Sequence, residues 1–259
     1  MSRILAITNQ KGGVGKTTTG VNLAASLAAA QQRVLLVDLD PQGNATMGSG
    51  VDKHALAATV YHVLLGTRTI AQARTRSVSG EYDLVPANRE LAGAEVEMVD
   101  MEQRENRLKN ALAEVENEYE FILIDCPPAL NLLTVNGLTA AHAVMIPMQC
   151  EYYALEGLSD LVATIRRVRL HLNPALEIEG LLRTMYDPRN TLAQQVSAQL
   201  LEHFGEKVYR TVIPRNIRLA EAPSHGLPAL KFDRSSKGAQ AYVALAGEML
   251  NRNPPNGRP

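Results

Sequence analysis

The stretch at residues 10–18, QKGGVGKTT, constrains the fold more than any other part of the chain. It follows an apolar run of strand length (3–8) and precedes an alanine-rich helical pattern (17–30). Strand, glycine-rich turn and helix in this order form a phosphate-binding loop, whose backbone N–H groups and helix start surround an oxyanion. Lys16 supplies a positive charge for the β- and γ-phosphates, and the Thr17 hydroxyl is placed to ligate Mg²⁺. The sequence therefore predicts a nucleotide site.

Two positions depart from the usual phosphate-loop pattern. Gln10 stands where the first glycine is expected, and Lys11 adds a second lysine inside the loop. A cation among N–H donors is unfavourable until an anion neutralises it. We therefore expect Lys11 to serve a bound phosphate rather than to be an ordinary surface charge.

Composition limits the class of protein. The 259 residues are 46% hydrophobic and 20% charged, enough for one α/β domain with a buried core. No apolar run reaches 18 residues and the chain enters a strand at once, so we expect neither a membrane span nor a signal peptide. Cys126 and Cys150 lack metal-ligand spacing, which favours a cytoplasmic location.

Charge is unevenly distributed along the chain. Residues 1–182 contain 15 Lys/Arg and 21 Asp/Glu, whereas residues 183–237 contain 9 and 5. A basic segment late in an acidic chain predicts a patch that meets a polyanion. On charge alone, a scattered solvated surface is the alternative.

Apolar runs alternate with helical patterns along the chain. Strands are expected at 33–40, 82–86, 120–125, 143–148, 177–185 and 208–213. Helices are expected at 54–65, 91–118 (exposed), 154–172, 191–203 and 237–251, a mobile loop at 45–52 and surface structure at 66–80. This alternation predicts a single α/β domain over residues 1–250, a mostly parallel twisted sheet with helices on both faces, and a flexible tail at 251–259.

Carboxylates close two of the expected strands. The strand at 33–40 ends in Asp38 and Asp40, and the strand at 120–125 ends in Asp125, followed by Cys126 and two prolines. An apolar strand that ends in aspartate, in a chain with a phosphate loop, is typical of a Walker B segment, whose carboxylate serves Mg²⁺. For Asp38, a structural carboxylate that caps the following loop is the alternative.

These motifs resemble the ParA/Soj branch of the ParA/MinD ATPases. The carrying segments are KGGVGKTT (11–18, similar to the deviant Walker A loop), DLDPQ (38–42), IDCPP (124–128), TMYD (184–187), IPRN (213–216) and EAPSHG (221–226), and the resemblance spans residues 2–250. It implies a P-loop NTPase fold of the SIMIBI type, with ATP and Mg²⁺ as cofactors.

The resemblance also implies roles for individual residues. Lys11 would cross a sandwich homodimer to the partner's phosphates, and Asp40 would orient the attacking water. Catalytic roles fall on Lys11, Lys16 and Asp40, and metal roles on Thr17, Asp38, Asp40 and Asp125. Nucleotide contacts fall on Lys11, Gly12, Gly13, Val14, Gly15, Lys16, Thr17 and Thr18, with an adenine pocket of Met185, Pro214, Arg215 and Asn216.

The implied function is ATP-dependent partitioning of chromosomal or plasmid DNA. Arg189 and Arg218 match the positions that this branch uses to bind double-stranded DNA without sequence preference, and a ParB-type partner would stimulate slow hydrolysis at the nucleoid. With the first strand beginning by residue 4, no N-terminal helix-turn-helix domain is expected. The tail has no apolar face, so membrane binding of the MinD type is not expected.

Other functions remain open on the sequence. A ParA-like ATPase that positions a protein cargo on the nucleoid would use the same loop chemistry, and a MinD-like regulator of the cell-division site is a further alternative. The nitrogenase iron protein and iron–sulfur carrier ATPases share the loop, but they bridge a cluster with paired cysteines. Cys126 and Cys150 form no Cys-x-x-Cys, which disfavours that class.

Overall fold

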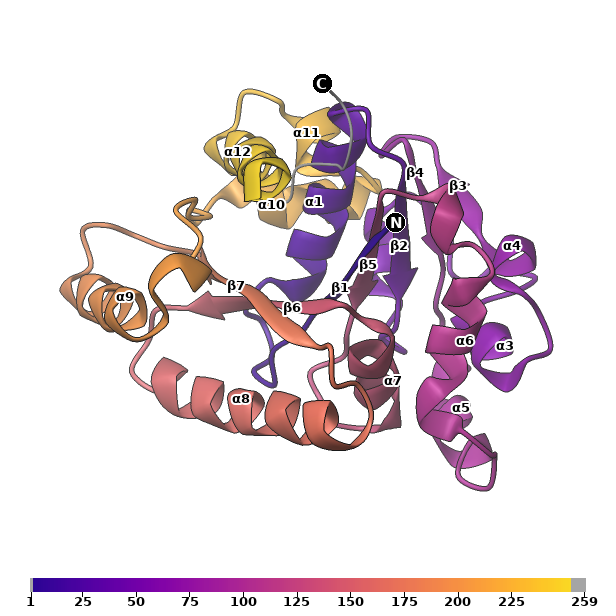
Figure 1. Ribbon diagram of the computed structural model, residues 1–259. Coiled ribbons are helices and arrows are strands. Elements are labelled where there is room, and N and C mark those ends of the chain that lie inside the picture. The colour runs from indigo at the N-terminus through magenta and orange to yellow at the C-terminus, as the bar shows by residue number, and fades with distance from the viewer. Residues whose placement is uncertain (1, 253–259) are drawn as a thin grey trace.

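A twisted sheet forms the centre of the protein, whose computed structural model describes residues 2–252 (Figure 1). Within that range the sheet has seven strands in the order β3-β4-β2-β5-β1-β6-β7. Every neighbouring pair is parallel except β3–β4. The strands are β1 (Arg3–Ile7), β2 (Val34–Asp38), β3 (Thr75–Ser77), β4 (Tyr82–Val85), β5 (Phe121–Asp125), β6 (Ala143–Gln149) and β7 (Glu177–Thr184). The predicted fold class is confirmed.

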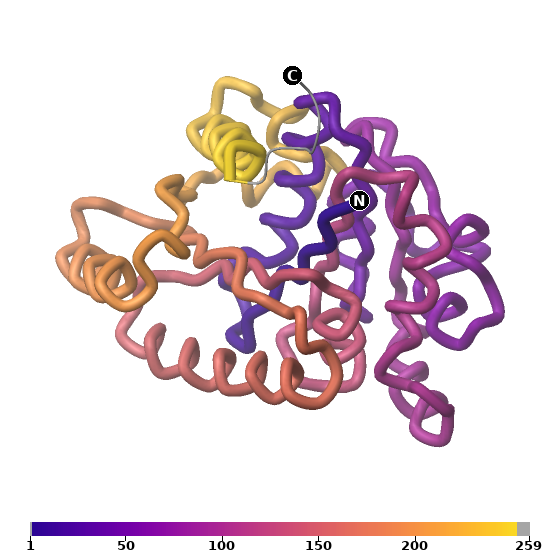
Figure 2. Tube along the Cα trace, viewed as in Figure 1, coloured from indigo at the N-terminus to yellow at the C-terminus, as the bar shows by residue number. Residues whose placement is uncertain are grey.

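Helices cover both faces of the sheet, as Figures 1 and 2 show. The α-helices are α1 (Lys16–Ala29), α2 (Asn44–Gly48), α3 (Val60–Leu65), α4 (Ile70–Ala73), α5 (Leu91–Glu97), α6 (Arg107–Ala113), α7 (Leu132–Ala140), α8 (Ala154–His171), α9 (Thr191–Phe204), α10 (Ile217–Glu221), α11 (Ala229–Phe232) and α12 (Lys237–Arg252). Short 3₁₀ turns are η1 (Arg104–Asn106), η2 (Glu116–Glu118), η3 (Gly205–Lys207) and η4 (Ala222–His225).

Alternate residues of each central strand enter two separate hydrophobic cores. On β5, Ile122 and Ile124 pack with α3 and α5–α9, whereas Phe121 and Leu123 pack with α1 and α12 on the other face. This alternation follows from the two-residue period of a strand. Because both faces are buried, the strands read as continuous apolar runs, and this made them visible in the sequence.

The segment predicted as a mobile loop at 45–52 is wrong in its first half, which forms helix α2. Left-handed glycines lie on either side of it, Gly43 with φ +63° and Gly50 with φ +77°. The side chain of Thr46 turns inward to the carboxylate of Asp38, which accepts hydrogen bonds from both its N–H and its hydroxyl. A contact between strand end and helix therefore orders a segment whose local sequence is typical of a loop.

Two expected helices are shorter or more broken than predicted, and one expected surface stretch contains regular structure. The helix expected at 54–65 is confined to α3, because Thr59 and His62 form a capping box at its start. The surface stretch 66–80 contains α4 and the edge strand β3. The expected exposed helix at 91–118 divides into α5, η1, α6 and η2, with Leu91, Leu108 and Leu112 buried. In this segment, burial of apolar side chains in the tertiary structure outweighs the helical spacing of the charged residues.

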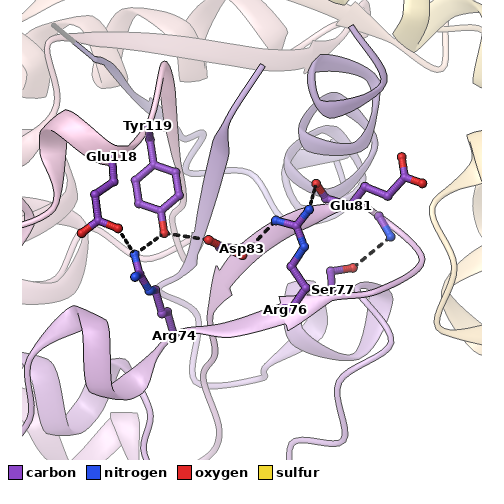
Figure 3. A network of polar contacts seen from close by, with 8 residues as sticks. Arg74, Arg76, Ser77, Glu81, Asp83, Glu118 and Tyr119 are labelled. Carbon is purple, nitrogen blue, oxygen red and sulfur yellow. Dashed lines mark hydrogen bonds and ion pairs between the residues drawn. The ribbon is translucent and has the colours of Figure 1, made fainter. Parts of the chain in front are cut away.

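A polar network holds the antiparallel edge hairpin β3–β4 against the segment that precedes β5 (Figure 3). The Tyr119 hydroxyl donates to Asp83 at 2.8 Å, and Arg74 donates to Tyr119 at 2.7 Å and to Glu118. Arg76 donates to the other oxygen of Asp83 at 3.0 Å. Each charged group meets a partner, so the edge of the sheet is fixed by side chains.

The strand predicted at 208–213 does not form. Isolated bridges join Leu181 to Val208 and, just beyond β7 and the segment, Tyr186 to Pro214. The N–H groups of residues 209 and 213 still donate to the carbonyl oxygens of Leu181 and Arg183 in β7. Side chains add to these bonds: Arg183 donates to the carbonyl oxygens of residues 209 and 210, and Glu248 accepts the N–H groups of residues 210 and 211. The two kinds of contact satisfy the backbone without a continuous ladder.

Helix α12 begins at the predicted residue and ends at Arg252, two residues beyond the predicted domain end at 250. Most of the predicted flexible tail, residues 253–259, lies outside the described residues.

Candidate nucleotide site

The glycine-rich loop connects β1 to α1 and is fixed at both of its ends. At its start, Asn9 donates to the Pro147 carbonyl at 2.8 Å and accepts the Lys11 N–H at 3.0 Å. Closer to α1, the buried Thr184 hydroxyl donates to the Val14 carbonyl at 2.8 Å. The loop is thus held by β6 and β7, the strands that lie next to β1 on one side.

The loop backbone forms a cradle free of side chains. Gly13 and Gly15 have φ +73° and +87°, in the left-handed region that favours glycine. A Cβ atom at Gly12 or Gly13 would meet nothing within 4 Å, so the space above the loop is open. Gly15 is the N-cap residue of α1 and leaves the first N–H groups of the helix free of a side-chain cap. These are the donors that an anion requires.

Lys16 lies at the base of this cradle and is almost fully buried. Its Nζ donates to the carbonyl oxygen of Lys11 at 3.0 Å. Burial lowers the pKa of Lys16 below its ordinary value, whereas the charges of Asp125 and Asp40 act to raise it. A buried cation that faces carboxylates and an open cradle fits a group that neutralises phosphate.

The loop lines a cavity of about 400 Å³. Its walls are Gly12, Gly13, Gly15, Lys16, Thr17, Thr18, Asp40, Gln42, Asn44, Pro128 and Met185. Most of the loop residues predicted to bind nucleotide therefore line one pocket. Asn44 was missed, because it opens the unpredicted helix α2, and Gln42 and Pro128 were quoted only as parts of motifs.

Asp38 and Asp125 lie side by side at the ends of β2 and β5, as partners in the sheet register. Burial raises the pKa of Asp38 to about 6, although hydrogen bonds from Thr46 act to lower it. Burial raises the pKa of Asp125 well above its ordinary value of 3.8, and the charge of Asp38 raises it further. Two buried carboxylates in contact favour a cation beside them.

The donors present fit Mg²⁺. Both carboxylate oxygens of Asp125 are buried without a hydrogen bond of good geometry among the described residues, and the nearby Thr17 side chain lowers its pKa. Asp40 is half-buried on the pocket wall, and one of its oxygens accepts the Gln42 N–H at 2.9 Å. Within residues 2–252, no group of three or more His, Cys, Asp or Glu side chains could hold a metal by itself. An ion here would therefore also need the Thr17 hydroxyl, phosphate oxygens or water.

Lys11 points away from the pocket. Its side chain is half-exposed and forms an ion pair with Glu151, which follows β6. It is not among the residues that line the cavity, although its carbonyl oxygen accepts from Lys16. The charge on Lys11 therefore does not serve the phosphate site of its own chain in this arrangement.

The residues predicted to form the adenine pocket are brought together only in part. Met185 lines the cavity and has φ +48°, unusual for a residue with a side chain. Pro214 lies beside it through the bridge to Tyr186, but neither Pro214, Arg215 nor Asn216 lines the cavity. Asn216 caps helix α10.

Arg189 and Arg218 are both exposed and both paired with acids. Arg189 makes two hydrogen bonds to Asp187, at 2.9 and 3.0 Å, and its side chain is 88% exposed. Arg218 pairs with Glu221 at 2.8 Å and with Asp233 at 3.3 Å. Exposed pairs of this kind contribute little, so a phosphate could replace either acid.

Both cysteines are buried free thiols. A Cβ atom at Gly137 would lie 2.8 Å from the sulfur of Cys126, which is therefore tightly packed. Burial raises the pKa of Cys126, and it raises that of Cys150 to about 11. Neither thiol fits a ligand for a surface cluster.

Comparison with known proteins agrees with this geometry. A family model described as an AAA domain matches residues 2–178. The sporulation initiation inhibitor protein Soj of Bacillus subtilis (strain 168) is 54% identical over 96% of this chain and 98% of its own length. The chromosome partitioning protein ParA of Caulobacter vibrioides (strain NA1000 / CB15N) is 50% identical over 96% and 94%.

A solved structure from Mycobacterium smegmatis is also similar. It is described as cobyrinic acid a,c-diamide synthase with bound ATP analog and magnesium, and it is 40% identical with a TM-score of 0.85. The match covers 97% of this chain and 96% of that one.

Fold and site together define a nucleotide-binding protein of the P-loop class, with a parallel sheet and a cradle at the start of α1. Identity of 50–54% to Soj and ParA, over nearly the full length of each chain, narrows this class to one family. The chain belongs to the ParA/Soj family of ATPases. In the part of the chain that the structure describes, no helix is long and apolar enough to cross a membrane.

Proposed function

We propose that this chain is a DNA-partitioning ATPase for a chromosome or a plasmid. ATP would close a homodimer, the closed dimer would bind double-stranded DNA without sequence preference, and a ParB-type partner would stimulate slow hydrolysis at the nucleoid. The relative named a chromosome partitioning protein is 50% identical, against 40% for the neighbour described as a synthase. This difference supports partitioning over a synthase activity.

Within the pocket, residues of this chain divide the work. Lys16 and the backbone of residues 12–18 would bind the triphosphate, and Thr17 with the carboxylates of Asp38 and Asp125 would hold Mg²⁺. When bound, the ion supplies charge neutralisation for the phosphates. Asp40, half-buried on the pocket wall, would orient the attacking water.

The proposed dimer rests on the position of Lys11. This residue lies in the phosphate loop, but its side chain points away from the pocket of its own chain. A hydrogen bond to a charged group contributes roughly 1.5–3 kcal/mol, so two symmetric contacts contribute about 3–6 kcal/mol. Breaking two exposed pairs with Glu151 costs at most about 2 kcal/mol. After this cost the two contacts contribute about 1–6 kcal/mol. Moving a two-state equilibrium from 1:99 to 99:1 needs about 5.5 kcal/mol, near the top of that range.

Size-exclusion chromatography with light scattering, in the presence of ATP and Mg²⁺, tests this role. We expect wild type to become a dimer and Lys11→Ala to remain a monomer that still binds ATP. Lys109→Ala, which changes an exposed lysine on α6, is the matched control. A Lys11→Ala protein that dimerises with ATP as wild type does would remove this mechanism.

The DNA-binding proposal depends on Arg189 and Arg218. Each follows the Tyr186–Pro214 bridge within four residues, Arg189 in the connection before α9 and Arg218 on helix α10, and Met185 beside that bridge lines the cavity. Phosphate would replace Asp187 on the first arginine and the acids on the second. Such contacts release counterions, with a slope of about −0.9 per phosphate on a log–log plot against salt.

Binding to random-sequence duplex DNA, measured with ATP across a salt series, tests the two arginines. Arg189→Glu and Arg218→Glu should each weaken binding and reduce the salt slope by about 1. Arg167→Glu, on the exposed side of α8, should leave both quantities unchanged. Unchanged binding by both test variants would remove these residues from the proposal.

A further inference from the structure

Thr46 makes an unusually complete set of hydrogen bonds at the ends of two strands. It is fully buried, and both its N–H and its hydroxyl donate to the same oxygen of Asp38, at 2.8 and 2.7 Å. The hydroxyl oxygen in turn accepts the N–H of Ala87, which follows β4, at 2.9 Å. The single hydroxyl proton therefore points at the carboxylate, and the hydroxyl takes part in a specific set of hydrogen bonds.

These contacts fix the orientation of the Asp38 carboxylate. One oxygen is held by Thr46, and the other accepts the Asp40 N–H at 3.2 Å. Asp125, its partner in the sheet register, has no comparable donors among the described residues. Of the two adjacent buried carboxylates, Asp38 is therefore oriented by the protein, whereas Asp125 has both oxygens available.

Thr46 also connects the carboxylate to the wall of the cavity. It lies on helix α2, whose first residue, Asn44, lines the cavity beside Asp40. The helix lies between the left-handed residues Gly43 and Gly50, where the chain can change direction. The Thr46 hydroxyl therefore fixes α2 and its pocket residue relative to the strand end that carries Asp38.

We infer that Thr46 is a positioning residue for Mg²⁺-dependent nucleotide binding, acting through Asp38. This inference rests on the proposed function, in which the Asp38 carboxylate helps to hold the ion. Residues that orient the ligands of a metal are worth about 10–100-fold in metal affinity. Loss of the hydroxyl should therefore weaken the Mg²⁺-dependent part of ATP binding and leave the Mg²⁺-independent part intact.

Binding of a fluorescent ATP analogue, titrated with Mg²⁺ and separately measured in EDTA, gives the test. Thr46→Val keeps the shape and removes the hydroxyl, so the half-saturating Mg²⁺ concentration should rise about tenfold or more. Its affinity in EDTA should stay within about twofold of wild type, and Thr46→Ser should restore the Mg²⁺ dependence to within about threefold. An unaltered Mg²⁺ titration in a folded Thr46→Val protein would overturn the inference.

Two further measurements separate the possible failures. Asp38→Asn should show an increase in required Mg²⁺ at least as large as that of Thr46→Val. If Asp38→Asn leaves the titration unchanged, the proposed role of Asp38 itself is wrong. If Asp38→Asn changes it and Thr46→Val does not, only the role of Thr46 is refuted. Should Thr46→Val fail to fold, Thr46→Cys, which replaces the hydroxyl by a weakly hydrogen-bonding thiol, gives the same test.

Discussion

Replacing Asp38 by asparagine should stabilise the nucleotide-free protein above neutral pH, although the residue belongs to the site. Burial raises the pKa of Asp38 from 3.8 to about 6, because the carboxylate is fully enclosed. Between these values the folded state binds more protons at Asp38 than the unfolded state does. The free energy of unfolding therefore falls as the pH rises through the folded pKa.

The size of the effect follows from the two pKa values. Their separation corresponds to roughly 3 kcal/mol in all. The part that is lost between about pH 5 and about pH 8 is about 1.4 kcal/mol. Asparagine stays neutral throughout, and its carbonyl oxygen can still accept both donors of Thr46, but its amide would face the Asp40 N–H. That mismatch costs about 1 kcal/mol at every pH.

Urea unfolding in EDTA, at the same ionic strength and at the two pH values, measures the prediction. Asp38→Asn should be about 0.6 kcal/mol more stable than wild type at the lower pH, because about 1.6 kcal/mol of the wild-type stability is already lost there, and it should gain about 1.4 kcal/mol more at the higher pH. The gain should exceed this value if loss of the Asp38 charge also lowers the pKa of Asp125. Asp100→Asn, an exposed aspartate, is the control. A difference between Asp38→Asn and wild type that does not change with pH would refute the reasoning from charge burial.

Two further predictions concern a backbone contact and an ion pair. Gly50→Ala should lower the free energy of unfolding by about 1–3 kcal/mol, because its φ is +77° and the new Cβ would lie 2.7 Å from the Gly226 carbonyl oxygen. Gly157→Ala on α8, where a Cβ meets nothing, should be neutral or stabilising by up to about 1 kcal/mol, and equal urea midpoints for the two variants would contradict this. Glu151→Gln frees Lys11, so ATP-dependent dimerisation should tighten by about 2- to 30-fold at low salt, with the difference shrinking in high salt. Weaker dimerisation in light scattering would show that Glu151 is needed in the dimer itself.

The parts of the fold that the sequence predicted are those decided by local pattern. The central strands are buried on both faces, so they appear as apolar runs in the sequence. The phosphate loop lies between β1 and α1, as its glycines and lysines predict. The register of the sheet then brings Asp38 beside Asp125, as expected of carboxylates that end neighbouring parallel strands. Spacing along the chain was sufficient for these features.

The parts that were missed depend on partners far away in the sequence. Helix α2 is ordered by a hydrogen bond between Thr46 and a strand end. The segment 208–213, predicted as a strand, is instead held by a few backbone bonds to β7 and by the side chains of Arg183 and Glu248. The pairing of Lys11 with Glu151 joins residues 140 positions apart. No local pattern marks these contacts, because each depends on how the elements pack.

The buried carboxylates at the base of the cavity destabilise the protein without a ligand, and for the same reason they favour the binding of a cation. Helix α1 packs over the sheet, where a Cβ at Gly20 would be in ordinary contact with the Asp125 side chain at 3.7 Å, and the helix helps to shield this carboxylate from water. Burying two of them in register is unfavourable without a cation. Lys16 supplies part of the compensation, and its own burial lowers its pKa, which weakens it in that role. A divalent ion with a triphosphate would satisfy the acids and the lysine together. Mg²⁺ and ATP together should therefore raise the free energy of unfolding by more than either ligand does alone. The Asp38→Asn variant should lose this cooperative effect, although it is more stable than wild type without ligand.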